Sequence, residues 1–375
     1  MKNEPIRIAQ IIGKWIGGGV EAVVMNYYRH INRDKIQFDF ICDNDSTDIP
    51  YEEIEALGGR VILIPPYQKV IKYQKELRRV LKEGKYKIVH SHINTLSVFP
   101  LYAAKRAGVN IRIAHSHSTT NKKEWKKNLM KQILKPFSKV FATDYMCCSE
   151  MAGRWLFGNK AYDNGKVYLL NNAIDLEKFR YDKKIRDLKR KELNIKDDTL
   201  VIGHIGRFVT QKNHEFIIEV FNNIQKINSD CILLLVGQGP LVEKIKEKVE
   251  FLGLTNKVKF LGQRTDANEF YQVFDLFLFP SLYEGLGMVA IESQVSGLPT
   301  ICSDQIPKMV RISDNVEFLT LDEDPKIWAE KVLKCVNKKE RTSNIDSAKS
   351  AGYDIIIESN KLESKYMKLG DVNEK

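Results

Sequence analysis

The chain has 375 residues, of which 43% are hydrophobic and 29% are charged, a balance typical of soluble globular proteins. This length predicts two or three domains, and no apolar run approaches the ~20 residues that a membrane-spanning helix needs. The N-terminus lacks the long apolar core of a secretory signal, so we expect a cytoplasmic protein. The six cysteines form no C-x-x-C pair, which favours reduced thiols over disulfides or a zinc site.

Positive charge is concentrated in the first half of the chain. Residues 1–197 carry 37 Lys and Arg against 22 Asp and Glu, whereas residues 198–375 carry 22 against 26. The first half is therefore the candidate face for an anionic partner, such as a membrane surface, a nucleic acid or a phosphorylated substrate. Ordinary solvated lysines are the alternative explanation.

Short apolar runs alternate with amphipathic segments in both halves, which indicates two doubly wound α/β domains with parallel sheets. The predicted strands of the first half are Ile6–Ile12, Phe38–Cys42, Arg60–Ile64, Ile88–His92, Ile111–Ala114, Lys139–Ala142 and Val167–Leu170. Those of the second half are Val201–Ile205, Cys231–Val236, Val258–Leu261, Leu276–Phe279 and Pro299–Cys302. Helices are predicted between them, for example at Val20–Ile31, Val70–Lys82, Glu215–Ile227 and Leu241–Leu252.

We expect an N-terminal domain at 1–172, a charged linker at 173–197 and a second domain at 198–350. The remaining stretch, 351–375, has helical periodicity without a following strand, so it could pack back across either domain.

A glycine cluster, Gly17-Gly18-Gly19, follows the first predicted strand and opens a helix. Glycines let a ligand approach the backbone, and a helix N-terminus favours anions such as phosphate. A tight strand-to-helix turn explains the cluster equally well. The spacing is not G-x-G-x-x-G, so it does not indicate a nicotinamide cofactor.

Two cations, Arg207 and Lys212, lie in the loop after the strand Val201–Ile205. An arginine fork and a lysine point charge could together hold a diphosphate. Two solvated surface cations are the alternative.

Two carboxylates, Glu284 and Glu292, follow the strand Leu276–Phe279. We expect Glu284 in a glycine loop and Glu292 in the second or third turn of the next helix, both directed toward one pocket. Carboxylates accept hydrogen bonds from hydroxyl pairs, which suits a sugar or a ribose. The backbone of Gly285–Gly287 could meet a phosphate at the helix start. A capping or exposed Glu292 is the alternative.

The loop Gly206–His214 and the pair Glu284-x7-Glu292, with Gly237-Gln238-Gly239-Pro240-Leu241 between them, resemble the retaining family 4 glycosyltransferases of the GT-B fold. Gly17–Glu21 and Asn172–Asp175 through Phe179 also fit that pattern. The likeness spans Ile6 to about Leu319, and the N-terminal half resembles the bacterial capsular and exopolysaccharide branch.

The resemblance implies two Rossmann-like domains facing a central cleft, and sugar transfer with retention from a nucleotide-sugar, expected to be UDP-linked. The acceptor would be a polyprenyl-diphosphate-linked saccharide, and no cofactor or metal is implied. Arg207 and Lys212 would contact the diphosphate, Glu292 the ribose and Glu284 the donor sugar. Further donor-binding positions would be Gly18, Gly19, Gly206, Gly237, Gly239, Gly285, Leu286 and Gly287. The alternatives are a nucleotide-sugar epimerase on the same fold, or a non-catalytic basic scaffold that binds nucleic acid.

Two histidine pairs, His90-Ser91-His92 and His115-Ser116-His117, follow predicted strands and could face one another. Family members place a histidine near the transferring carbon, which implies His117 first and His115 second. A zinc site is possible for H-x-H, but no third ligand type recurs nearby. A structural role is the expectation for His90.

Asp43-Asn44-Asp45 is formally a D-x-D motif, but its polar neighbours predict a solvated turn, as for Asp322-Glu323-Asp324.

A basic amphipathic helix is predicted within Lys122–Lys139, where Trp125, Leu129, Ile133 and Phe137 recur every four residues. Such a helix can bind an anionic membrane interface, which would place the protein peripherally at the inner face of the cell membrane. An ordinary surface helix is the alternative, and no nucleic-acid-binding motif is present. The expected membrane-binding residues are Lys122, Lys123, Trp125, Lys126, Lys127 and Lys131.

Overall fold

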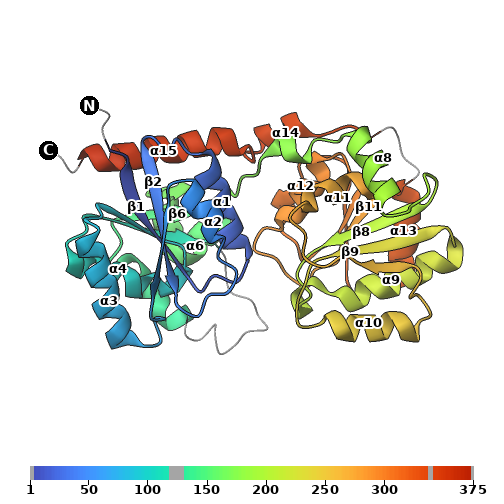
Figure 1. Ribbon diagram of the computed structural model, residues 1–375, viewed down its shortest axis with the longest axis horizontal. Helices are drawn as coiled ribbons and strands as arrows, with labels where there is room; N and C mark the ends of the chain where they lie inside the picture. Colours follow the sequence, from blue (N-terminus) through green and yellow to red (C-terminus); the bar gives the residue numbers. More distant parts are fainter. Residues whose placement is uncertain (1–3, 118–130, 337–340, 373–375) are drawn as a thin grey trace. The chain divides into compact units, whose positions relative to one another are not determined.

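The computed structural model describes residues 4–117, 131–336 and 341–372 of the chain (Figure 1). Its contacts divide the chain into two compact units. The first comprises Met1–Ile174 with Gly352–Lys375, and the second comprises Asp175–Ala351. In the described residues, no helix is both long enough and apolar enough to cross a membrane.

The first unit is built on a seven-stranded sheet in the order β3-β2-β1-β4-β5-β6-β7, with every pair parallel. The strands are β1 Ile6–Gly13, β2 Ile36–Asp43, β3 Arg60–Ile64, β4 Ile88–Ser91, β5 Ile111–Ser116, β6 Asp144–Cys147 and β7 Val167–Leu169. Because both faces of a parallel sheet are buried, these strands are nearly continuous apolar runs, as the sequence pattern predicts.

Helices cover both faces of this sheet. They are α1 Gly19–His30, α2 Tyr51–Ala56, α3 Val70–Glu83, α4 Val98–Ala107, α6 Glu150–Phe157, α7 Asn159–Asp163 and α15 Ile355–Val372, with 3-10 turns η1 Asn94–Ser97 and η2 Lys135–Lys139. Alternate residues of β1 face opposite sides: Ile8 belongs to one core with Tyr28 and Tyr366, and Ala9 belongs to the other with Leu77.

The C-terminal helix α15 packs against the first unit, as the sequence allowed (Figure 1, red). Ile174 and Asp354 form a parallel bridge that brings the chain back, and α15 then contacts α1. Leu362 and Tyr366 are buried in the same core as β1 and β2.

The second unit has a six-stranded parallel sheet in the order β10-β9-β8-β11-β12-β13. Its strands are β8 Leu200–Ile205, β9 Cys231–Val236, β10 Val258–Phe260, β11 Leu276–Phe279, β12 Thr300–Ser303 and β13 Val316–Leu319. Its helices are α8 Lys183–Glu192, α9 His214–Ile227, α10 Val242–Phe251, α11 Ala267–Val273, α12 Met288–Val295, α13 Pro325–Val336 and α14 Ile345–Ser350, with 3-10 turns η3 Leu176–Phe179, η4 Thr210–Lys212 and η5 Lys308–Val310. Both units are thus doubly wound α/β layers, as predicted.

Two strand predictions need correction. The run Lys139–Ala142 is not a strand: the sheet is joined instead by β6, where Met146 and Cys147 are fully buried, whereas Val140 is exposed. The sequence prediction also omitted β13, whose alternating Val316 and Phe318 are interrupted by a glutamate.

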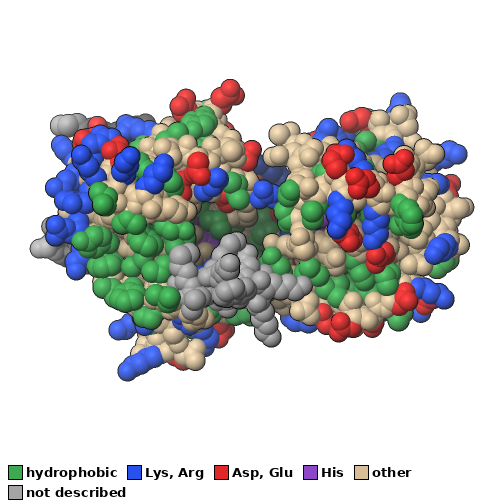
Figure 2. Space-filling model, turned by 90° about the horizontal axis from the view of Figure 1, so that it is seen from below, with side chains coloured by type: hydrophobic (Ala, Val, Ile, Leu, Met, Phe, Trp, Pro, Cys, Tyr) green, Lys and Arg blue, Asp and Glu red, His purple; other side chains and the backbone are tan. Residues whose placement is uncertain are grey.

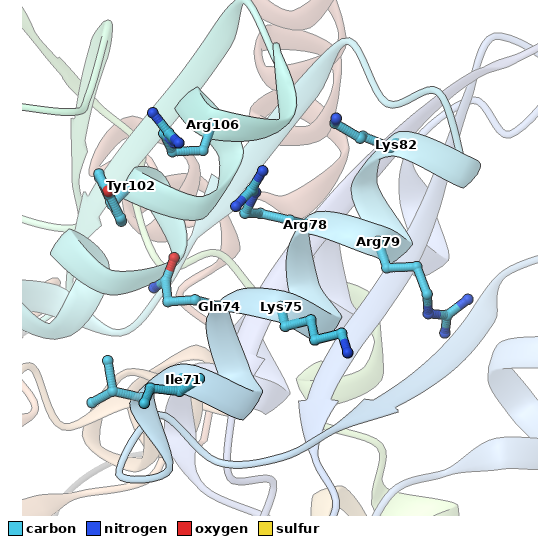
Figure 3. A pocket seen from close by; sticks show the side chains of 9 residues that line it. Ile71, Gln74, Lys75, Arg78, Arg79, Lys82, Tyr102 and Arg106 are labelled. Carbon is cyan, nitrogen blue, oxygen red and sulfur yellow. The ribbon is translucent and has the colours of Figure 1, made fainter.

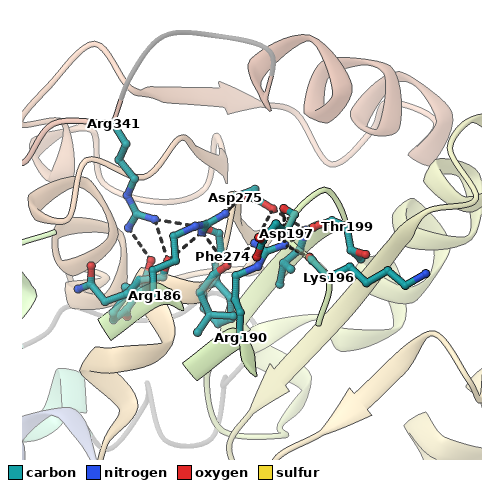
Figure 4. Close-up of polar contacts among 12 residues, drawn as sticks. Arg186, Arg190, Lys196, Asp197, Thr199, Phe274, Asp275 and Arg341 are labelled. Carbon is teal, nitrogen blue, oxygen red and sulfur yellow. Dashed lines mark hydrogen bonds and ion pairs between the residues drawn. The ribbon is translucent and has the colours of Figure 1, made fainter. Parts of the chain in front are cut away.

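The expected linker at 173–197 is also wrong, because its charged residues form helix α8 within the second unit. Arg186 pairs with Asp275 at 2.5 Å, and Arg190 donates to the carbonyl oxygens of Lys196 and Thr199 (Figure 4). Arg341 reaches the same region, where it donates to the carbonyl of Phe274 at 3.0 Å. The charge that suggested a solvated linker is therefore used to fasten α8 to the sheet.

Candidate active site

The predicted donor-binding motifs of the second unit lie at the carboxyl ends of β8, β9 and β11, where parallel α/β sheets bind ligands. The loops after β8 and β9 interlock: Phe208 N–H donates to the carbonyl of Gln238 at 2.9 Å, and Gly206 N–H donates to Val236. A Cβ on Gly237 would lie 2.1 Å from the Gly206 oxygen, and one on Gly239 would lie 2.5 Å from the Phe208 oxygen. These two glycines are thus required by close backbone packing.

Lys212 and Glu284 form an ion pair at this edge of the sheet. Their Nζ and Oε1 atoms are 2.7 Å apart, and the two side chains are only 16% and 8% exposed. The Gln211 side chain donates to Glu284 Oε2 at 3.1 Å. The backbone carbonyl of Gln211 accepts from Leu282 N–H. The sequence placed both charged residues near one ligand, and the structure brings them into contact.

Arg207 lies in the same loop as Lys212, but it is exposed. Among the described residues its guanidinium has no hydrogen-bond or ionic partner. An exposed guanidinium beside a paired lysine remains available to an incoming anion.

Glu292 is the fifth residue of α12, so it lies in the second turn as predicted. Tyr271 of α11 donates to Glu292 Oε2 at 2.7 Å. Burial raises the pKa of Glu292, and this shift is opposed by the Tyr271 hydrogen bond and the charge of Lys212. Glu292 is thus within electrostatic reach of the Lys212–Glu284 pair. Tyr271 could not be singled out from the sequence, since a tyrosine on an amphipathic helix is usually a core residue.

The glycine loop before α12 ends at Gly287, which caps the helix with a φ of +93°. An L residue is strained in this left-handed region, and glycine is not. Leu286 is buried, whereas Gly285 is exposed. The loop therefore presents backbone at Gly285 while Leu286 anchors it.

The glycine cluster of the first unit opens α1, with Gly18 as the capping residue. A Cβ on Gly19 would meet open space, so this backbone is approachable. The carboxylate of Glu21 accepts from Ile16 N–H at 3.1 Å and lies beside Gly18, where its negative charge opposes a bound phosphate. Donor binding by Gly18 and Gly19 stays a prediction.

The two histidine pairs do face one another at the ends of β4 and β5. His90 Nε2 and His115 Nδ1 are 3.0 Å apart, and His92 Nδ1 and His117 Nε2 are 2.9 Å apart. All four rings are buried. Burial lowers their pKa values, that of His117 to about 3, so all four are neutral at pH 7.

The histidine cluster also bears on metal binding. His90, His92 and His115 each place a ring nitrogen within 4.8 Å of the others, close enough to share an ion. These rings already hydrogen-bond to one another or to neighbouring side chains. Within the described residues, no acidic side chain hydrogen-bonds to the cluster, so a buried dication would be uncompensated. The donor set therefore fits a metal poorly.

The comparisons with known proteins agree with these motifs. The family described as "Glycosyl transferases group 1" matches residues 185–351, and "Glycosyltransferase Family 4" matches residues 17–178. EpsF of Bacillus subtilis, named as a glycosyltransferase, is 34% identical over 362 residues, covering 94% of each chain. The chain belongs to glycosyltransferase family 4.

Other relatives of this glycosyltransferase come from surface-polysaccharide systems. An Escherichia coli UDP-Gal:α-D-GlcNAc-diphosphoundecaprenol α-1,3-galactosyltransferase is 26% identical, covering 80% of each chain. CapH of Staphylococcus aureus, named for capsular polysaccharide biosynthesis, is 24% identical over 96% of this chain and 99% of its own. The solved structure of Anabaena HepE with UDP and glucose superposes with a TM-score of 0.79 at 17% identity, covering 96% and 99% of the two chains. The fold of the glycosyltransferase is therefore GT-B.

A cavity of about 350 Å³, lined by both charged and apolar side chains, opens at the carboxyl ends of β1 and β2 in the first unit of the glycosyltransferase. Lys14, Asp43, Tyr67 and Lys69 are among its lining residues. The solvated turn predicted at Asp43–Asp45 is wrong for Asp43, which ends β2 and is only 5% exposed. Burial raises the pKa of Asp43 to about 6, with a further contribution from Asp45. Asp45 itself is exposed and pairs with Lys14 at 2.7 Å.

A second, larger groove of about 560 Å³ lies between α3 and α4 of the glycosyltransferase (Figure 3). Its charged lining residues are all cationic: Lys75, Arg78, Arg79, Lys82 and Arg106. Figure 3 shows Arg78 of α3 extending toward α4, which carries Arg106. Arg78 Nε is buried and lacks a hydrogen-bond partner among the described residues. This surface is not evident from the sequence, because its cations are spread over two helices.

Most of the predicted basic amphipathic helix of the glycosyltransferase, including Lys122, Lys123, Trp125, Lys126 and Lys127, lies outside the described residues. In the described residues that follow, Ile133 and Phe137 of the predicted helix are 59% and 49% exposed, and Val140 is 55% exposed. Apolar side chains also gather over a broad area of the first unit in the view of Figure 2.

Proposed function

We propose that this glycosyltransferase moves a sugar, with retention, from a UDP-sugar to a polyprenyl-diphosphate-linked saccharide during assembly of a cell-surface polysaccharide. The observation that carries the proposal is the set Arg207, Lys212, Glu284 and Glu292, held by loops and α12 at one edge of the second sheet. The named substrates of the Escherichia coli relative and the UDP bound to HepE support this choice of donor and acceptor.

The charge that develops during transfer explains the cations. As the bond between the sugar and the diphosphate breaks, negative charge grows on the departing phosphate. Arg207 can move onto that phosphate because nothing in the described part of the chain holds its guanidinium. Lys212 is already fixed by Glu284, so its charge needs little reorganisation. In the proposed complex, the leaving phosphate takes the proton of the acceptor hydroxyl.

Glu292 and Glu284 would bind hydroxyl groups of different parts of the donor. Glu292, oriented by Tyr271, would accept hydrogen bonds from the ribose, and Glu284 would accept them from the donor sugar. The backbone at Gly206 and the loop Gly285–Gly287 would lie alongside the diphosphate. We also propose that the reaction needs no metal or other cofactor, because Arg207 and Lys212 supply the positive charge that a metal would otherwise provide.

The donor site can be tested by calorimetric titration with UDP, GDP and ADP. We expect the wild type to prefer UDP. Glu292→Ala should weaken UDP binding at least tenfold, which corresponds to the loss of about one charge-assisted hydrogen bond. Glu243→Ala, which removes an exposed carboxylate on α10, is the matched control. Folded protein that binds none of the three nucleotides would contradict the proposed donor site.

The 350 Å³ cavity of the first unit is the proposed acceptor site. Tyr67 and Tyr73 offer apolar ring surface and Asp43 offers a buried carboxyl, a combination suited to a saccharide. Lys14 and Lys69 supply positive charge for the diphosphate that links the saccharide to lipid. Tyr67→Ala should raise the KM for the acceptor and leave the affinity for UDP unchanged.

The acceptor is a membrane lipid, and we propose that the groove between α3 and α4 faces the anionic inner leaflet. Ile71 is 85% exposed at its rim, and Val70 and Tyr102 are also exposed. Exposed apolar side chains beside a cluster of cations are the combination that binds an anionic interface.

Vesicle co-sedimentation tests the membrane surface. Wild type should bind vesicles that contain phosphatidylglycerol and should not bind pure phosphatidylcholine. The double charge reversal Arg78→Glu with Arg106→Glu should reduce binding to anionic vesicles at least tenfold. Lys226→Glu, a charge reversal at an exposed site of the second unit, should not. Equal losses in the two proteins would contradict the assignment of this face.

A further inference from the structure

Gln10 and Tyr366 join the four buried histidines into one hydrogen-bonded cluster in the first unit. Gln10 lies on β1 and Tyr366 on α15, and both side chains are fully buried. The Gln10 amide contacts Tyr366 OH at 3.3 Å through Nε2 and His92 Nε2 at 2.7 Å through Oε1. Tyr366 OH lies 2.6 Å from His90 Nδ1. Two chains of hydrogen bonds therefore start at opposite ends of one amide.

The first chain leads from the amide nitrogen to His115. Because Gln10 Nε2 donates to Tyr366, the tyrosine hydroxyl donates to His90 Nδ1. A neutral imidazole has one N–H, so the proton of His90 is on Nε2 and is donated to His115 Nδ1. The proton of His115 is then on Nε2, which is an N–H donor at the end of the chain.

The second chain leads from the amide oxygen to His117. Because Gln10 Oε1 only accepts, His92 carries its proton on Nε2. His92 Nδ1 is then bare and accepts from His117 Nε2–H, 2.9 Å away. The last atom of this chain is His117 Nδ1, which is a bare acceptor.

The two terminal atoms, His115 Nε2 and His117 Nδ1, are both buried and have no hydrogen-bond partner within the described residues. Their rings are stacked with centroids 3.9 Å apart. Their opposite character does not depend on how the Gln10 amide is oriented. Exchanging its oxygen and nitrogen reverses both chains, so one end still donates while the other accepts.

We infer that Gln10 and Tyr366 are positioning residues that hold His115 and His117 as one donor and one acceptor, ready for a sugar hydroxyl of the proposed function. A hydroxyl both donates and accepts, whereas an anion would need two donors and a cation two acceptors. The identity of the ligand rests on the proposed function, but the protonation pattern does not. The C-terminal helix thereby contributes to the site through Tyr366.

The protonation pattern can be read by long-range ¹H–¹⁵N correlation on protein labelled with ¹⁵N-histidine. The chain has seven histidines, and single His→Gln variants would assign their signals. We expect His90, His92, His115 and His117 all to be neutral with the proton on Nε2. Their ring signals should not shift between about pH 5.5 and 8. A cluster in which His115 Nε2 and His117 Nδ1 are both donors or both acceptors would overturn the inference. So would displacement of these N–H signals by one equivalent of Zn²⁺.

Tyr366→Phe tests the positioning role. The variant removes only the hydroxyl that orients His90, so His90 and His115 should lose their single tautomer while His92 and His117 keep theirs. Turnover should fall about tenfold, with the affinity for UDP unchanged. Tyr27→Phe is the matched control, because this buried tyrosine lies in the same core as Tyr366 but donates to the Asn171 carbonyl.

Two results separate the possible failures. If Tyr366→Phe leaves the His115 tautomer unchanged, the positioning role is refuted. If wild-type protein shows the expected tautomers but transfers no sugar, the proposed function is refuted, and with it the hydroxyl ligand.

Discussion

Replacing Glu284 with Gln should tighten UDP binding and slow sugar transfer. The carboxylate pairs with Lys212 at 2.7 Å, and neither side chain is more than 16% exposed. Glutamine has nearly the same volume and keeps an oxygen for Lys212 Nζ. The substitution therefore removes a negative charge with little change in packing.

The size of the effect on binding follows from the distance. A phosphate oxygen bound to Lys212 Nζ at about 2.8 Å would lie no more than about 5.5 Å from Glu284 Oε1. The repulsion of two unit charges at this separation is about 3 kcal/mol at an effective dielectric of 20, and about 0.8 kcal/mol in water. A value near 1.4 kcal/mol corresponds to a tenfold gain in UDP affinity.

Transfer should change in the opposite direction, because the neutral amide is a weaker acceptor for sugar hydroxyls. Loss of a charge-assisted hydrogen bond costs about 1.5–3 kcal/mol, so kcat/KM should fall by about 10- to 100-fold. Calorimetry with UDP and a radiolabelled transfer assay measure the two effects. Glu243→Gln, which alters an exposed pair with Lys246, should change neither. Weaker UDP binding by Glu284→Gln would refute the reasoning, since it would mean that the carboxylate supports diphosphate binding rather than opposing it.

Three further predictions each concern a single residue. Arg207→Ala should weaken UDP binding about tenfold without lowering the thermal midpoint, because the exposed guanidinium has no hydrogen-bond or ionic partner among the described residues; a fall in the midpoint would show a structural role. Gly237→Ala should destabilise the second unit by about 3 kcal/mol in chemical unfolding, since its Cβ would lie 2.1 Å from the Gly206 oxygen; unchanged stability would contradict the interlocked loops. The raised pKa of Asp43, about 6, means that the folded state binds this proton more tightly than the unfolded state, so stability should fall as the pH rises from about 4 to 6. Asp43→Asn should abolish that fall and, after allowance for solvent screening, be about 1–2 kcal/mol more stable than wild type at pH 7.5; an unchanged pH profile would show that Asp43 is not the group responsible.

The sheets were predictable because parallel strands are buried on both faces. Cys231–Val236 and Leu276–Phe279 are uninterrupted apolar runs, and the structure gives them the predicted bounds. Strands that lack this signal were misplaced or missed: β6 begins with the polar Asp144, and β13 contains Glu317.

The helix α8 shows why charge patterns mislead about burial. Its sequence is mostly lysine and arginine, which is typical of a solvated linker. Arg190 is nevertheless 2% exposed, because its guanidinium satisfies backbone carbonyls at the edge of the sheet. The partners of such a buried cation come from residues distant in sequence, so the local pattern cannot reveal them.

The positions of the candidate site residues were predictable from the sequence, but the contacts between them were not. The positions of Glu284 and Glu292 follow from strand and helix signals, and the sequence allowed the two histidine pairs to face one another. The contact between Lys212 and Glu284 joins residues 72 positions apart. Tyr366 joins the histidine cluster from a helix 276 positions beyond His90. These contacts depend on tertiary packing, for which a single sequence has no local signal.

Transfer from UDP-sugars to a short polyprenyl-diphosphate-linked N-acetylglucosamine, in the presence of EDTA, tests the central claim most directly. The account predicts that one UDP-sugar yields a product whose new anomeric bond has the configuration of the donor, by NMR, and that EDTA leaves the rate unchanged. An inverted anomeric bond would contradict the proposed mechanism, and a rate abolished by EDTA would contradict metal independence. Acceptor-independent conversion of the UDP-sugar would identify an epimerase instead.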